Sequence, residues 1–152
     1  MMSDPSETCE LSIERHIDAL PAHVWEIMTE RMAEWWCPKP WTVELVEMDR
    51  RPGGRSAMIM RGPNGEAMPQ EGIYLAYEPG RRFAFTDAVT ADLKPAKPFM
   101  IGIFEIEADG DGTLYRACAR HWTEEAMKQH AEMGFEQGWG AVADQLKALC
   151  EA

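Results

Sequence analysis

The first part of the chain alternates apolar and polar positions. Between Leu11 and Ala19 the apolar residues fall on every second position, except at Arg15, which is the period of a strand with one buried face. Pro21 follows, and its fixed φ and missing N–H suit the first turn of a helix, which we expect to run to Glu30. Further helical turns are expected over residues 31–36, and the prolines at 38 and 40 end them.

Six further strand patterns, separated by turn signals, occupy the middle of the chain. We predict these strands over residues 41–48, 55–61, 70–77, 82–86, 99–108 and 113–121. Pro79 and Gly80 stand in the order that a type II turn requires, and residues 109–112 join the last two strands as a hairpin. Residues 87–98 contain two prolines and show no period, so we expect a long loop there, which is uncommon unless it has a function.

The carboxy-terminal segment has the pattern of a helix. Thr123 is a good N-cap, acidic residues follow it, and no proline occurs after Pro98. One side of the helical wheel carries an apolar stripe, which consists of Met127, Ala131, Phe135, Gly138, Val142, Leu146 and Leu149. We therefore predict one continuous helix over residues 123–150.

These elements predict an α+β fold of the helix-grip (START/Bet v-like) type. Consecutive hairpins require an antiparallel sheet, and a sheet with one long amphipathic helix buries both apolar faces only if the sheet curves around the helix. We expect a single helix-grip domain over residues 11–152, with short helices after its first strand and a flexible tail over residues 1–10.

Composition and charge narrow the classes of partner. The 152 residues are 45% hydrophobic and 27% charged, as expected for a globular chain, and 26 acidic against 15 basic side chains give a net charge of −11. This charge repels phosphate backbones and anionic lipid headgroups, so we expect neither nucleic acid nor membrane as a partner. The polar, acidic start of the chain lacks an export signal, and no apolar stretch is long enough to span a membrane. We expect a soluble, cytoplasmic protein.

Two glycines lie on the apolar face of the predicted helix. Gly134 and Gly138 lie on the apolar stripe near Ala131, although each glycine weakens a helix. Either the helix packs closely on the sheet there, or a hollow lies between the two. In the second case we expect Gly134→Leu to block the hollow and leave the fold stable, and we expect the 87–98 loop to act as a mobile lip over it.

Aromatic and Met side chains suit the lining of such a hollow, although they suit an ordinary core equally well. Met58 and Met60 lie on the same side of one predicted strand, and Phe83 and Phe85 lie on the same side of another. Around Tyr74 both sides of the strand are apolar, so the pattern leaves the direction of its side chain open. The ligand-binding residues that we predict are Trp36, Met58, Met60, Tyr74, Phe83, Phe85, Phe104, His121, Met127, Ala131, Gly134, Phe135 and Gly138.

Signals of catalysis and metal binding are weak. The four cysteines are widely separated and contain no C-x-x-C pair, and His121 and His130 have no spacing typical of metal ligands. We predict no metal, no cofactor and no catalytic residue. An enzyme would need polar groups to converge inside the cavity, and the candidates for this are Arg15, Tyr74, Asp87 and His121.

Several short motifs, taken in order, resemble a known family. They are Arg15-His16-Ile17-Asp18-Ala19-Leu20-Pro21, Val24-Trp25, Trp35-Trp36, Asp49-Arg50-Arg51-Pro52-Gly53-Gly54, Gly72, Pro79 to Asp87, Gly112-Thr113, Gly138-Trp139 and Gln145-Leu146. In this order and spacing they resemble the activator of heat-shock protein 90 ATPase homologue-like family of the START-related (SRPBCC) superfamily, over residues 11–150. The resemblance implies a helix-grip fold, often with a deep apolar cavity, and no catalytic motif shared by all members.

The resemblance leaves several functions open, because the superfamily includes lipid and hormone binders, polyketide cyclases and chaperone regulators. The eukaryotic co-chaperones that name the family carry an additional amino-terminal domain, for which 152 residues leave no room. We expect the chain to bind a small hydrophobic or aromatic molecule in the cavity. The alternatives are a cyclase-like or hydrolytic enzyme and a chaperone-regulating or stress-response interaction protein, and a protein partner or homodimer stays open.

Overall fold

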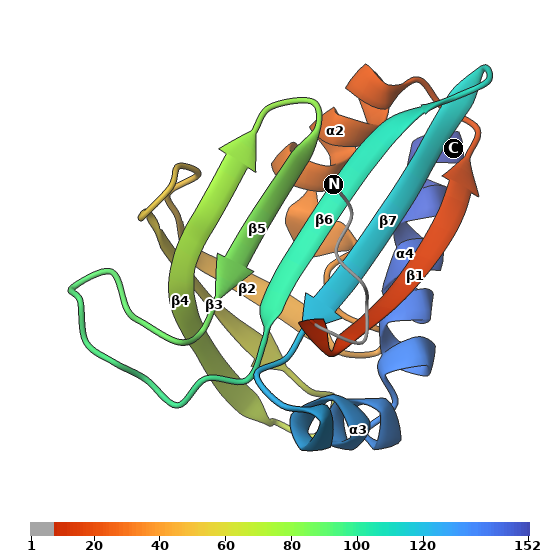
Figure 1. The fold of residues 1–152 in the computed structure, drawn as a ribbon. Coiled ribbons are helices and arrows are strands. Elements are labelled where there is room, and N and C mark those ends of the chain that lie inside the picture. Colours follow the sequence, from red (N-terminus) through yellow and green to blue (C-terminus); the bar gives the residue numbers. More distant parts are fainter. Residues whose placement is uncertain (1–7) are drawn as a thin grey trace.

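A curved antiparallel sheet of seven strands forms the body of the molecule (Figure 1). The structure is a computed structural model and describes residues 8–152. The strands are β1 Glu10–Ile17, β2 Thr42–Met48, β3 Arg55–Arg61, β4 Ala67–Glu78, β5 Arg82–Thr86, β6 Ile101–Asp109 and β7 Gly112–Arg120. They lie in the order β1-β7-β6-β5-β4-β3-β2, so the first strand pairs with the last and β2 forms the far edge.

The helices cover one side and one end of the sheet. They are α2 Pro21–Glu30, the short 3-10 turn η1 Met32–Glu34, α3 Glu124–Glu132 and α4 Phe135–Glu151. Figure 1 shows α2 and α4 behind the sheet, and α3 at the end opposite α2. The hydroxyl of Thr123 accepts a hydrogen bond from the backbone N–H of Ala126 at 3.0 Å, which caps α3 as its sequence predicts.

The seven strands and the flanking helices confirm the α+β helix-grip fold. The observed bounds of α2, β3 and β5 agree with the predicted ones residue for residue. Gly80 has a φ of +79°, and the N–H of Arg81 donates to the carbonyl of Glu78 at 3.0 Å, as expected for the predicted turn. Local turn chemistry therefore sets these strand ends.

Several strand bounds differ from the prediction, and strand pairing explains three of the starts. β1 starts at Glu10, inside the segment expected to be a flexible tail, because Glu10 pairs with Arg120 of β7. Residues 1–7 of the expected tail lie outside the described residues. β4 starts at Ala67 rather than at residue 70, because its pairing with β3 continues to Arg61. β6 starts at Ile101 rather than at residue 99, where its pairing with β5 begins.

The prediction of one continuous helix over residues 123–150 is wrong. Gly134 has a left-handed φ of +98°, which ends α3 and starts α4. Because this turn interrupts the helical repeat, the residues before and after it no longer share one face. The expectation for Gly134→Leu is wrong for the same reason, since a leucine is strained at this φ whatever space surrounds it.

The core lies between the sheet and α2 and α4. Helix α2 contributes the buried Val24 and Met28, and α4 contributes the buried Leu146. At the α2 end, the ring of Trp25 packs on Phe83 of β5 at a centroid distance of 6.1 Å. Side chains of α2 therefore fill this end of the sheet's inner side.

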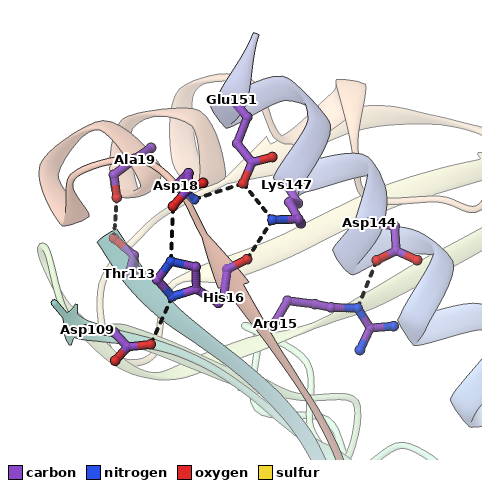
Figure 2. A network of polar contacts seen from close by, with 9 residues as sticks. All are labelled: Arg15, His16, Asp18, Ala19, Asp109, Thr113, Asp144, Lys147 and Glu151. Carbon is purple, nitrogen blue, oxygen red and sulfur yellow. Dashed lines mark hydrogen bonds and ion pairs between the residues drawn. The ribbon is translucent and has the colours of Figure 1, made fainter. Parts of the chain in front are cut away.

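Polar contacts hold α4 against β1 at the edge of the sheet (Figure 2). Nε of Arg15 donates to Oδ1 of Asp144 at 2.8 Å, and Nζ of Lys147 donates to the backbone carbonyl of His16 at 2.8 Å. Both contacts join a residue of β1 to a residue of α4, and they therefore fix the position of the helix along the strand.

Gln145 ties α4 to the segment that precedes β2. Its Nε2 donates to the carbonyls of Trp35 at 3.1 Å and Cys37 at 2.7 Å, and its Oε1 accepts from the N–H of Lys39 at 2.9 Å. Trp36 lies inside this segment, so one amide side chain of α4 fixes the backbone on both sides of an aromatic residue.

Candidate functional site

A cavity of about 560 Å³ lies at the part of the sheet that α2 does not cover. Strands β3 to β7, the end of the loop before β6, and helices α3 and α4 contribute to its wall. Most lining side chains are apolar: Trp36, Pro38, Met58, Met60, Pro69, Phe85, Ala96, Phe99, Met100, Phe104, Met133, Trp139 and Val142. The polar and charged ones are Ser56, Gln70, Glu71, Thr86, Asp87, Lys97, Tyr115 and His130.

Six of the thirteen predicted ligand-binding residues line this cavity. They are Trp36, Met58, Met60, Phe85, Phe104 and Gly138. Gly138 faces open space, because a Cβ built there meets no heavy atom within 4 Å. At Gly138 the glycine therefore adds room to the cavity, whereas its role in binding a molecule stays a prediction.

Tyr74 and Phe83 do not line the cavity but belong to the core. Both side chains are almost fully buried, and their ring centroids lie 6.2 Å apart. Trp25 of α2 packs on Phe83, at a centroid distance of 6.1 Å. Strand parity placed Phe83 on the correct side of the sheet, but the position of α2 along the strand decides that Phe85 and not Phe83 reaches the cavity.

Met127, Ala131, Gly134 and Phe135 are also absent from the cavity wall. Ala131 is exposed, and Phe135 is buried in the core against the ring of Trp139 at 4.7 Å. Their predicted place depended on a helical wheel drawn across the break at Gly134. In α3 the cavity side carries His130 instead, which is the buried residue of that helix.

His121 is one contact removed from the cavity, behind His130. Nδ1 of His121 lies 2.7 Å from the carbonyl oxygen of Cys9, and Nε2 of His121 lies 2.9 Å from Nδ1 of His130. The rings of Phe99 and Phe135 pack on His130 at centroid distances of 4.6 and 5.2 Å. Burial, with His121 beside it, lowers the pKa of His130 to about 4, so this ring is neutral near pH 7.

Asp87 holds the loop that borders the cavity. Its Oδ1 accepts from the backbone N–H groups of Phe99 at 2.8 Å and Met100 at 3.4 Å, which closes the ends of the loop on each other. Within the loop, a bridge between Val89 and Pro95 gives some local order that the sequence did not predict. In Figure 1 the loop reaches out from the sheet between β5 and β6, and its mobility stays a prediction.

The four polar groups that an enzyme would need do not converge. Of these, Asp87 lines the cavity, whereas Arg15 pairs with Asp144 on α4 and Tyr74 is buried in the core. His121 has both ring nitrogens engaged, as described above. The described residues therefore do not form the acid–base arrangement considered from the sequence.

Thiol and metal chemistry find no support in the described part of the chain. Burial raises the pKa of Cys37 and Cys150 to about 11 and that of Cys118 to about 12, so these thiols stay protonated at neutral pH. Within residues 8–152, no group of three or more His, Cys, Asp or Glu side chains is placed to hold a metal ion. In the same range, no helix is long and apolar enough to cross a membrane.

Sequence reasoning missed several lining residues, among them His130, Met133 and Trp139. Trp139 follows Gly138 directly, and a wheel drawn for α4 alone is the signal that places both near the cavity. No comparable signal identifies His130, because its place depends on the turn at Gly134.

Comparison with known proteins gives a family and several similar structures. The family model described as Activator of Hsp90 ATPase homolog 1-like protein matches residues 18–151. A crystal structure of a protein from Nitrosomonas europaea is 35% identical, with 92% of each chain covered and a TM-score of 0.86. One from Mycobacterium smegmatis is 26% identical, with 97% of this chain and 93% of that chain covered and a TM-score of 0.79.

A solution structure of a protein from Arthrobacter aurescens is 24% identical, with 97% of this chain and 89% of that chain covered and a TM-score of 0.82. At this identity the similarity shows the fold alone. No curated protein matches the chain. The family match covers most of the sequence and agrees with the observed helix-grip fold. The chain therefore belongs to the Activator of Hsp90 ATPase homolog 1-like family, of the SRPBCC type.

Proposed function

We propose that this protein binds a small hydrophobic or aromatic molecule in the cavity between the sheet and helices α3 and α4. The observation that carries this proposal is the open space at Gly138, on a wall of aromatic and Met side chains. An ordinary core closes such a space, because empty apolar volume is destabilising. A space that the fold maintains at a glycine is better explained by a bound molecule.

The size and chemistry of the cavity support a ligand of modest size. About 560 Å³ lies within the range of about 300–1,000 Å³ that is typical of small-molecule sites. Met58, Met60 and Met100 contribute flexible, polarizable side chains, which adapt to ligands of different shape. The polar groups on the wall then orient the ligand.

Neither alternative function has comparable support among residues 8–152. The groups considered for a cyclase-like or hydrolytic enzyme lie apart, as described above. A chaperone-regulating surface would gather large exposed apolar residues together. Here Met68 and Leu75 share β4, and the others lie on different elements or loops: Leu20, Val46, Leu93, Trp122 and Met133.

The test is a cavity-filling substitution, Gly138→Leu. Leucine at this position enters the open space and also favours the helix, so we expect loss of binding without loss of stability. Thermal unfolding with a panel of apolar and aromatic compounds measures both properties, since a compound that binds the native state raises its melting temperature.

The matched control is Gln137→Leu, because Gln137 is the exposed neighbour of Gly138 in α4. This variant should respond to the same compounds as the wild-type protein. The proposal fails if no compound of the panel stabilises the wild-type protein, or if Gly138→Leu retains the full response.

A further inference from the structure

The direction of the hydrogen bonds at His121 and His130 follows from a backbone carbonyl. A carbonyl oxygen only accepts, so the contact with Cys9 requires a proton on Nδ1 of His121. In the neutral ring, Nε2 of His121 then carries a lone pair and accepts from Nδ1–H of His130. When both rings are neutral, Nε2 of His130 is therefore left without a proton.

Nε2 of His130 is the nitrogen of this pair that remains available to a ligand. No residue within 8–152 hydrogen-bonds to it, and His130 lines the cavity. Burial keeps the ring neutral at physiological pH, because it lowers the pKa of His130 to about 4. The His130 side chain is buried among the aromatic rings of Phe99 and Phe135, so a ligand that donates a hydrogen bond to its Nε2 gains affinity over one that does not.

We infer that the cavity selects a hydroxylated aromatic molecule, of the phenol or naphthol class, whose O–H donates to Nε2 of His130. This inference rests on the proposed function, because it names the class of molecule that the cavity binds.

The aromatic part of the ligand follows from the rings on the wall. Phe104 is nearly parallel to Phe85, with an interplanar angle of 8° and a centroid distance of 5.8 Å, and to Trp139, with 13° and 5.4 Å. Rings that are already parallel favour a planar ligand, because offset stacking continues their arrangement.

The charged groups on the wall favour a neutral ligand over an anion. Asp87 and Glu71 both line the cavity and repel an anion, whereas Lys97 is the cation among the lining residues. Asp87 already accepts two backbone hydrogen bonds, and Glu71 pairs with Arg55. A neutral hydroxyl group therefore fits the wall better than a carboxylate or a phosphate.

The first test compares two probes that differ in the donor alone, 2-naphthol and 2-methoxynaphthalene. Calorimetric titration at pH 7.5 should give 2-naphthol about tenfold higher affinity, the effect of one additional hydrogen bond. Equal affinities overturn this inference and leave the proposed function standing. If neither probe binds while other apolar compounds do, this inference alone fails; if nothing binds, both fail.

The second test changes the acceptor. His130→Phe keeps an aromatic ring and removes Nε2, so the preference for 2-naphthol should disappear while 2-methoxynaphthalene still binds. His23→Phe is the matched control, because His23 is exposed on α2, and it should keep the tenfold preference. A preference that survives in His130→Phe overturns the inference.

A measurement on the wild-type protein covers the case in which His130→Phe does not fold. Long-range proton–nitrogen correlation spectra of the imidazole rings at pH 7.5 distinguish a protonated from an unprotonated ring nitrogen. We expect His130 to carry its proton on Nδ1, and its Nε2 signal to move when 2-naphthol is added but not when 2-methoxynaphthalene is added. A proton on Nε2, or equal shifts with both probes, overturns the inference.

Discussion

At the scale of single residues, two histidines of this fold have pKa values displaced in opposite directions. His130 is buried, which lowers its pKa to about 4. His16 is exposed, and hydrogen bonds to Asp109 and Asp18, with Nδ1 2.9 Å from the first carboxylate and Nε2 3.2 Å from the second, raise its pKa (Figure 2). The two residues therefore give the stability opposite dependences on pH.

For His130 we predict a contribution that is lost as the pH falls. The unfolded chain takes up a proton near pH 6.5 that the folded chain takes up only near pH 4, so acid favours the unfolded state in this window by up to about 3 kcal/mol. Urea unfolding of wild type and His130→Phe at pH 7.5, 6 and 4.5 measures it. The free energy of unfolding of the wild-type protein minus that of His130→Phe should decrease as the pH falls. A difference that stays constant with pH contradicts the prediction.

For His16 the sign is reversed. Its raised pKa gives a stabilisation that is complete below pH 6.5 and is lost as the pH rises through the folded-state value. His16→Gln should therefore destabilise the protein most at acidic pH and least at alkaline pH, in the same urea experiment. His23→Gln, at an exposed position of α2, is the control. An effect of His16→Gln that grows with pH would show that the assignment is wrong.

At the scale of elements, two glycines of the carboxy-terminal segment have opposite roles. Gly134 has a φ of +98° at the junction of α3 and α4, whereas Gly138 lies within α4 beside open space. We predict that Gly134→Ala destabilises the fold by about 1 kcal/mol or more, because alanine is strained at this φ. Gly138→Ala should stabilise it by about 0.5–1 kcal/mol. Denaturant unfolding of both variants is the measurement, and shifts of the same sign contradict the prediction.

The contact of α4 with the segment before β2 depends on the Gln145 side chain. Gln145→Ala removes three hydrogen bonds to backbone groups, and we expect a loss of about 1–3 kcal/mol in the free energy of unfolding. Gln137→Ala, at an exposed position of the same helix, is the control and should have little effect. Because Trp36 lies in the released segment, its fluorescence should also change in Gln145→Ala. Equal stabilities of Gln145→Ala and Gln137→Ala would exclude this role of Gln145.

At the scale of the whole molecule, the loop between β5 and β6 borders the cavity and is itself exposed to solvent. Residues 91–98 are exposed, whereas Asp87 holds the backbone at Phe99 and Met100. We predict fast amide hydrogen exchange over residues 88–98, slow exchange in β5 and β6, and slower exchange of the loop when a ligand is bound. Asp87→Ala should extend the fast exchange to residues 99 and 100. Exchange in the loop that is as slow as in the strands contradicts the prediction.

The sequence predicts those parts of the fold that depend on neighbours along the chain. Pro79 and Gly80 define a turn by their own backbone preferences, and α2 starts where Pro21 fits a first helical turn. Strand parity also placed Met58, Met60 and Phe85 on the cavity side. These features need no knowledge of distant contacts.

The rest of the candidate site depends on how elements meet. Phe83 and Phe85 have the same parity, and only the position of α2 decides that the first is covered. Gly134 and Gly138 are alike on a helical wheel, and only the backbone conformation separates the turn from the cavity wall. The contact of His121 with His130 across the junction after β7 is likewise tertiary, and no spacing in the sequence predicts it.

The pairing of β1 with β7 bears on the order in which the chain folds. Glu10 lies opposite Arg120, so the first strand of the sheet in the sequence pairs with the last one. Contacts of such large sequence separation form late and slow folding. Until synthesis reaches β7, β1 lacks its strand partner, and it also lacks helix α4, which packs on it. Its unpaired backbone groups are then open to other chains. Nascent chains that end before β7 are therefore expected to aggregate or to occupy chaperones, until β7 joins β1 to the other strands of the sheet.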